Sequence, residues 1–237
     1  MAKRIDPKAD RKQKLEQLKR EQRTKERRKT LMTVGIASLL GLALIGAVVV
    51  PAVLKSQKVN SEKKAAERDA NLPLANFGVK AAAAECSEEQ VENPIPEGGK
   101  HGQEGQTVEY EVAPPNGGQH SSSTLPVMTG FYDRSAKPSP ERAVHDLEHG
   151  VIVAWYDNKL AESEVKELRR AAASAVDKKM RLVAIPWDRA DFDGNKHFVL
   201  TSWGHTQRCG KVSGEVMESF VKKNMNSKDA PEAGASI

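Results

Sequence analysis

The stretch Ser139–Tyr156, SPERAVHDLEHGVIVAWY, contains the signals for a helix and a strand in immediate succession. Ser139 is a typical helix N-cap residue, and proline is favoured at the first helical position that follows it. Gly150 is a C-terminal cap signal, so the helix is predicted to end at His149. The continuous apolar run after it has the length of a strand that is covered on both faces. This stretch therefore predicts a sheet with helices packed on it.

The chain around this stretch supplies further elements of the same kinds. Alternating or apolar runs predict more strands, and apolar residues at helical spacing predict more helices. Asp193-Gly194 is a turn signal that predicts a hairpin between the strands on either side. The predicted strands are Val108–Val112, Met180–Trp187 and His197–Trp203, and the predicted helices are Glu162–Lys178 and Glu215–Asn224. The fold class that this order predicts is α+β, a small sheet with packed helices.

Leu31–Leu54 predicts one transmembrane helix before this domain. Its 24 residues, LMTVGIASLLGLALIGAVVVPAVL, include no charged side chain. A helix of that length spans the roughly 30 Å hydrocarbon core of a bilayer. The stretch is long for the apolar region of a cleaved signal peptide, and no small-residue cleavage site follows it. Lys and Arg are denser on the N-terminal flank, which predicts a cytoplasmic N-terminus and an extracellular C-terminal domain.

The positive charge of the chain is concentrated in its first 30 residues. They hold 13 Lys or Arg and 5 Asp or Glu, a net charge of +8, whereas the whole chain carries +5. This tail predicts a basic cytoplasmic helix facing the anionic inner leaflet of the bilayer. No aromatic side chain is interleaved with the basic residues, so we expect no nucleic-acid partner.

Composition divides the chain into five parts, and both cysteines fall beyond the membrane segment. The predicted parts are the tail 1–30, the transmembrane helix 31–54, a juxtamembrane stalk or linker 55–83, the extracytoplasmic α+β domain 84–225 and a disordered tail 226–237. Two thiols in an oxidising compartment are usually bonded to each other, which predicts a Cys86–Cys209 disulfide. A cysteine metal ligand and two separate thiols stay open as alternatives.

Histidines form the constellation best suited to chemistry. His145 and His149 lie four residues apart and share a face of the predicted helix, a spacing that suits one metal ion. His120, in the preceding loop, is a candidate third ligand. Glu148 and Asp146 are candidates for carboxylates that orient the imidazole rings from the second shell. Three imidazoles suit Zn or Cu. In the alternative interpretation His149 only caps the helix and His145 is an ordinary packed residue.

His145–His149 also matches the inverted zincin pattern H-x-x-E-H, but a strand follows directly, where a metalloprotease needs a second long helix. His205 is a possible fourth ligand. The sequence favours a protein without enzymatic activity but does not decide this question, and it assigns no catalytic residue. Two further classes stay open, a non-catalytic interaction subunit of a larger membrane complex and a hydrolase that uses a histidine base.

Several segments together resemble a family of actinobacterial membrane proteins catalogued as domain of unknown function 3105. They are YEVAPPNGGQH at 110–120, GFYD at 130–133, PERAVHDLEHG at 140–150 and LTSWG at 200–204. The resemblance covers roughly residues 84 to 225, and the H-D-L-E-H-G segment before the apolar strand is its most specific part. The loop departs from the family form, which is close to PPTSGPH. The resemblance carries over His120, His145 and His149, implies a Gram-positive cell surface, and implies no established activity.

Overall fold

The computed structural model describes residues 16, 19–35, 53–57, 60–61, 64, 68–69, 71–192 and 194–236. The chain separates into two compact units, Met1–Glu62 and Lys63–Ile237. In the first unit, residues 19–35 are helical and exposed; residues 19–30 belong to the predicted basic helix, and 31–35 to the predicted transmembrane segment. Among the described residues we find no helix with the length and apolar character needed to cross a membrane. Residues 36–52, most of the predicted transmembrane segment, lie outside the described residues.

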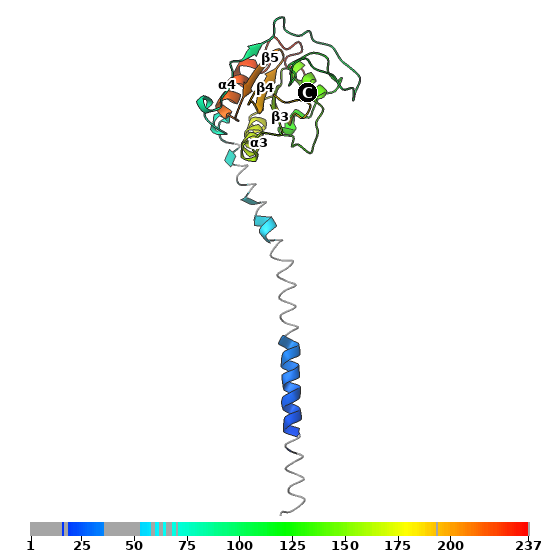
Figure 1. Ribbon diagram of the computed structural model, residues 1–237, viewed down its shortest axis with the longest axis vertical. Coiled ribbons are helices and arrows are strands. Elements are labelled where there is room, and N and C mark those ends of the chain that lie inside the picture. Colours follow the sequence, from blue (N-terminus) through cyan, green and yellow to red (C-terminus); the bar gives the residue numbers. More distant parts are fainter. Residues whose placement is uncertain are drawn as a thin grey trace, which may run out of the picture. The chain divides into compact units, whose positions relative to one another are not determined.

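The second unit is built around a five-stranded sheet with the order β1-β5-β4-β2-β3 (Figure 1). Its strands are β1 (Gln90–Val91), β2 (Ile152–Tyr156), β3 (Leu182–Pro186), β4 (Phe198–Ser202) and β5 (His205–Cys209). Its helices are α2 (Pro140–Glu148), α3 (Glu162–Asp177) and α4 (Gly214–Asn224), with the short 3₁₀ helices η1 (Leu74–Asn76), η2 (Ala81–Ala83) and η3 (Val127–Thr129). The predicted α+β class is confirmed.

The central strand β2 pairs with β3 in parallel and with β4 in antiparallel orientation. The predicted hairpin of β3 with β4 is therefore wrong, because β2 lies between them. α3 makes the crossover that parallel pairing requires. β4, which follows β3 in the sequence, lies on the other side of β2. The hairpin of the sheet is formed by β4 and β5, which pair in antiparallel orientation through Ser202 and His205. Gly204 takes φ +74° in the turn between them.

Alternate residues of β2 enter two separate hydrophobic clusters, one on each face of the sheet. Ile152, Ala154 and Tyr156 pack with α3, α4 and η1. Val153 and Trp155 pack with α2 and with the loop that contains Leu125 and Val127. Because both faces of β2 are covered, the strand is apolar throughout, as the sequence predicted.

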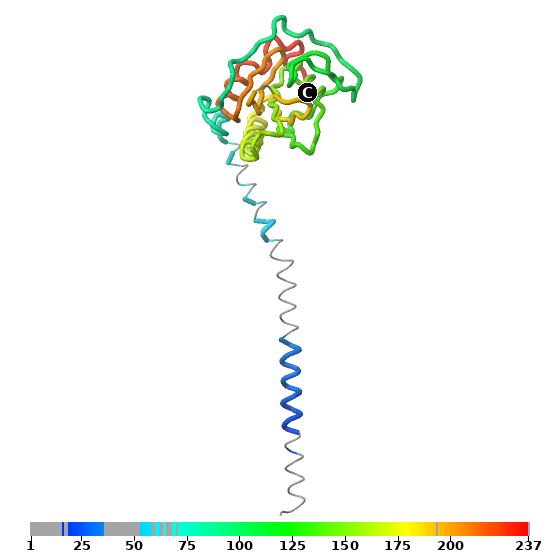
Figure 2. Tube along the Cα trace, in the orientation of Figure 1, coloured from blue at the N-terminus to red at the C-terminus, as the bar shows by residue number. Residues whose placement is uncertain are grey.

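The predicted strand Val108–Val112 is wrong, because this segment lies in the long loop between β1 and α2. Figure 2 traces this loop in teal to green. Its backbone groups bind side chains in place of a neighbouring strand. The Val108 N–H donates to Glu141 Oε1 at 3.0 Å, and its carbonyl accepts from Arg189 Nη1 at 3.2 Å. The alternation of apolar and polar residues therefore predicted a strand here, but no neighbouring strand among the described residues pairs with this segment.

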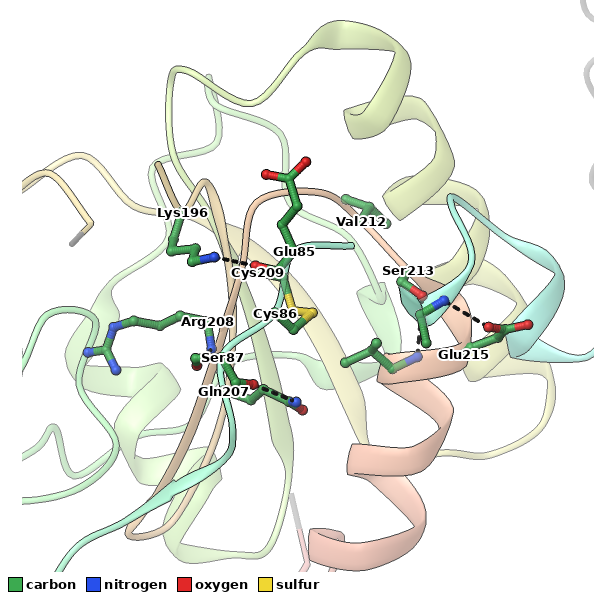
Figure 3. Close-up of a disulfide and its surroundings, with 12 residues drawn as sticks. Glu85, Cys86, Ser87, Lys196, Gln207, Arg208, Cys209, Val212, Ser213 and Glu215 are labelled. Carbon is green, nitrogen blue, oxygen red and sulfur yellow. Dashed lines mark hydrogen bonds between the residues drawn. A yellow bond between two sulfur atoms is a disulfide. The ribbon is translucent and has the colours of Figure 1, made fainter. Parts of the chain in front are cut away.

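The Cys86–Cys209 disulfide is present, as predicted, and joins the segment before β1 to the end of β5 across 123 residues (Figure 3). Part of the predicted linker 55–83 belongs to the globular unit. Leu74 and Phe77 are buried in its core, and the Asp69 carboxylate makes a bidentate ion pair with Arg170 on α3. The linker prediction is therefore wrong for these residues. Leu74 and Phe77 are core side chains, but the charged residues around them in the sequence give the segment the composition of a linker.

Candidate metal centre

α2 positions two functional side chains by its periodicity and its caps. Ser139 Oγ accepts a hydrogen bond from the Arg142 N–H at 3.3 Å, as the N-cap prediction required. At the other end Gly150 takes φ +82°, which turns the chain directly into β2. His145 and Glu148 are three residues apart, so they project from the same face. The sequence thus fixes the relative placement of two candidate ligands within one helix.

A loop pairing adds two further histidines to this face. Residues His101 and His120 form an isolated parallel bridge, in which the Gly102 N–H donates to the His120 carbonyl at 2.6 Å. The His120 N–H donates in turn to the Lys100 carbonyl at 3.1 Å. The rings of Trp203 and His120 pack in a T-shaped arrangement with their centroids 5.8 Å apart. The two imidazoles are therefore held by backbone pairing and by the β4–β5 turn.

Together, one ligand atom from each of His101, His120, His145 and Glu148 lies within 4.8 Å of the others. The three ring centroids are 4.8 to 5.0 Å apart. The side chains of His120 and Glu148 are fully buried, whereas the side chain of His101 is 39% exposed. The cluster is therefore an enclosed group of nitrogen and oxygen donors with one solvent-facing member.

His120 and Glu148 face each other in a way that an ordinary hydrogen bond does not explain. His120 Nδ1 lies 2.8 Å from the Gly118 carbonyl, which can only accept, so Nδ1 carries a proton. In the neutral ring Nε2 then presents a lone pair, and it lies 2.8 Å from Glu148 Oε2. Neither of these buried atoms has a hydrogen-bond partner among the described residues. Two electron-rich atoms at this distance require a cation or a proton between them.

The surroundings of His145 favour a neutral imidazole. His145 Nδ1 is buried without a hydrogen-bond partner in the described part of the chain. Burial lowers the pKa of His145, and His120, His149 and His101 nearby lower it further, against an opposing effect of Glu148. The Gly99 N–H binds Glu148 Oε1, which leaves Oε2 for the cluster. Neutral imidazole and carboxylate are the forms that bind metals.

Three predicted site residues take other positions. His149 is outside the group of four, because its Nδ1 lies 3.0 Å from the Ser236 carbonyl and its Nε2 lies 3.1 Å from Glu232 Oε2. Asp146 binds the Leu125 N–H at 3.0 Å, and burial raises its pKa to about 8. His205 lies between Glu89 and Asp229, at 2.8 and 3.0 Å.

The sequence interpretation assigned Glu148 to the second shell and did not find His101. Glu148 contributes a donor atom directly, because Gly99 turns its second oxygen toward the histidines. His101 stands in a stretch rich in Pro, Gly and charged residues, with no periodicity around it. What brings His101 to the cluster is its pairing with His120, a tertiary contact that the sequence pattern does not reveal.

One comparison with known proteins gives a match. The model of a family described as "Protein of unknown function (DUF3105)" matches residues 101–237, more than half of the chain. The matched segment begins at His101 and includes all four residues of the cluster. No curated protein and no solved structure matches the chain.

Proposed function

Since the chain belongs to this DUF3105 family, for which no activity is described, we propose from the geometry that its globular unit binds one divalent transition-metal ion. The ligands are His101, His120, His145 and Glu148. The observation that carries the proposal is the approach of His120 Nε2 to Glu148 Oε2 at 2.8 Å without hydrogen-bond geometry. A metal ion replaces the repulsion between two lone pairs with two coordinate bonds.

Support for a metal also comes from the hydrogen bond on the far side of the His120 ring. Metal-binding histidines usually donate their other ring N–H to a carbonyl or carboxylate, which fixes the tautomer and the ring orientation. The Gly118 carbonyl occupies this position at His120. Bonds of about 2.0–2.1 Å would place the donor atoms at most about 4.2 Å apart. The cluster, now within 4.8 Å, closes by a small shift, for which the exposed His101 has room.

The donor set restricts the kind of ion. Three imidazoles and a carboxylate suit Zn(II) or Cu(II), whereas Cu(I) prefers thiolate and thioether ligands. Both cysteines of the chain are bonded to each other and offer no thiolate. We therefore propose Zn(II) or Cu(II) as the resident ion, in a role of metal binding or handling.

Metal analysis of the full chain tests this proposal. We expect one equivalent of Zn(II) or Cu(II) after loading and removal of excess, measured by elemental analysis, with affinity from chelator competition. His145→Ala and Glu148→Gln should each lower the affinity by at least about 100-fold, more than is typical of second-shell changes. His197→Ala is the matched control, since His197 pairs with Asp157.

A chain that folds fully and binds neither ion would overturn the metal proposal. It would favour the alternative that the four side chains only hold the loop onto α2 within an interaction subunit of a membrane complex. Affinities that are equal in the wild type and in both ligand variants would also contradict the ligand assignment.

We further propose that residues 31–54 anchor the protein in the cell membrane, with the N-terminus in the cytoplasm next to the anionic leaflet and the globular unit outside. The disulfide supports the outer location, because oxidising compartments maintain such bonds. The charge asymmetry of the flanks supports the orientation. Protease added to intact cells should degrade the C-terminal unit, and full protection before lysis would contradict this topology.

A further inference from the structure

We propose that the C-terminal segment 226–236, here called the C-terminal strap, is a positioning element of the His–Glu cluster. This inference rests on the proposed function, because the property that the strap would change is the metal affinity of the cluster. The strap itself would supply no ligand. The sequence predicts a disordered tail at 226–237. That expectation is wrong for 226–236, since the strap makes backbone hydrogen bonds with the end of α2.

The strap binds the carbonyl groups that end α2. A helix leaves its last carbonyls without partners inside the helix. The Glu232 N–H donates to the Glu148 carbonyl at 3.0 Å, the Gly234 N–H to the His149 carbonyl at 3.2 Å, and the Asn226 N–H to the Gly150 carbonyl at 3.0 Å. One of these three carbonyls belongs to the ligand residue itself. The strap therefore holds the helix turn that presents Glu148.

His149 adds a side-chain attachment at the same place. Its ring meets the Ser236 carbonyl and the Glu232 carboxylate of the strap, at 3.0 and 3.1 Å. This ring also packs against the His145 ring in a T-shaped arrangement, with the centroids 4.7 Å apart. His149 thus connects the strap to a ligand ring, which gives it a role other than the ligation predicted from its spacing.

The strap also holds the loop that leads to His101. A Cβ atom on Gly98 would lie 2.5 Å from Pro231 Cγ and would collide with Glu148 Oε1, so Gly98 is enclosed between the strap and the ligand carboxylate. The next residue, Gly99, donates its N–H to that carboxylate. Two residues later the chain reaches His101. Pro231 therefore holds the Gly98–Gly99 loop next to Glu148 and so fixes the position of His101 relative to Glu148.

Two contacts fasten the strap to the rest of the unit. His205 in β5 faces Asp229 Oδ2 at 3.0 Å, and Arg181 Nη2 donates to the Ala235 carbonyl at 2.7 Å. Ala230 is buried in the cluster of apolar residues beneath α2. A chain that ends at Ala230 keeps the Asp229 contact and this buried side chain, while it loses Pro231, Glu232 and everything after them.

The test compares the full chain with the chain ended at Ala230, both purified in detergent, by Zn(II) affinity and by amide hydrogen exchange. We expect Zn(II) to bind about 10-fold more weakly to the shortened chain, within the range of second-shell changes. In the metal-free protein the amide of Gly99 should exchange faster, because its acceptor carboxylate is no longer held. Zn(II) affinity within twofold of the full chain, with unchanged exchange at Gly99, would overturn the proposal.

Point variants keep the test valid if the shortened chain fails to fold. Gly98→Ala should weaken Zn(II) binding about 10-fold. Adding Pro231→Gly should restore part of that loss, since it removes one of the two contacts that the new methyl group meets. Glu232→Gln should weaken binding severalfold, and Glu109→Gln, an exposed control, should not. Gly98→Ala with unchanged affinity and no coupling to Pro231→Gly would contradict the strap's role.

The two proposals can fail separately. If the full chain binds no metal, the metal proposal fails, while Gly99 exchange still reports whether the strap holds the loop. If the full chain binds metal and the shortened chain binds it equally well, only the strap proposal fails.

Discussion

At the scale of single residues, the cluster is distinguished by several buried donor atoms that face one another without forming hydrogen bonds. Asp146 and Glu148 are both buried on α2. Asp146 accepts from a backbone N–H, and burial raises its pKa to about 8. Glu148 faces histidine nitrogens that provide no hydrogen bond to its second oxygen. Three buried atoms without a hydrogen-bond partner among the described residues, His120 Nε2, His145 Nδ1 and Glu148 Oε2, lie together in the cluster, and this grouping is the reason for assigning the site there.

The Asp69–Arg170 pair gives a prediction at this scale. The Arg170 guanidinium binds both Asp69 oxygens, at 2.6 and 2.9 Å, and holds the pKa of Asp69 below its usual value. A carboxyl whose pKa is lowered by folding adds stability above its unfolded pKa of about 3.9, and this stability is lost as pH falls through the folded pKa. Between pH 6 and pH 2, wild type should lose about 1–2 kcal/mol more unfolding free energy than Asp69→Asn.

Urea denaturation at the two pH values measures this difference. The control is Asp188→Asn, because Asp188 is exposed and should behave like wild type. Equal losses in wild type and Asp69→Asn would contradict the prediction.

At the scale of elements, α2 has to stop abruptly so that β2 can begin. Gly150 makes the turn with φ +82°, a conformation that residues with a side chain rarely adopt. The same position is crowded, since a Cβ atom would lie 2.8 Å from Asn226 Cα. The requirement for glycine here thus has both a conformational and a steric part, and the steric part comes from the strap.

Gly150→Ala should destabilise the unit by about 2–4 kcal/mol, the sum of left-handed strain and overpacking. Gly194→Ala is the matched control, because Gly194 has φ +64° and nothing within 4 Å of an added Cβ. It should cost only about 1 kcal/mol. Thermal unfolding of the two variants checks the difference, and equal destabilisation would show that Asn226 is not an obstacle.

At the scale of the whole molecule, the disulfide ties the segment before β1 to the end of β5, the strand that pairs with β1. Cys86 and Cys209 are separated by 123 residues. Closing a loop of that length restricts the unfolded chain, and removal of a native disulfide typically costs about 2–5 kcal/mol. The unit therefore depends on an oxidising environment for part of its stability.

Cys86→Ser/Cys209→Ser should lower the melting temperature of the unit by on the order of 10 °C. A reducing agent should lower the wild type to the same value and leave the double variant unchanged. A wild type that melts at the same temperature with and without reductant would contradict this prediction.

The sequence alone determined the elements whose signals are local. The caps Ser139 and Gly150, the apolar run of β2 and the periodicity of α3 predicted those elements almost to the residue, because capping and burial leave local patterns. The same local spacing identified His145 as a candidate ligand and Glu148 as a carboxylate near it. The cysteine pair followed from composition and topology.

Only the tertiary structure decided which of these residues meet. Val108–Val112 alternates like a strand, but Glu141 and Arg189 take its backbone groups. His149 has the spacing of a ligand, but its ring lies against the strap, near the Ser236 carbonyl and the Glu232 carboxylate. His101 joins the cluster from a loop without any pattern. The physical reason is that a helix fixes neighbours three and four residues apart, while loops are placed by contacts with segments distant in the chain.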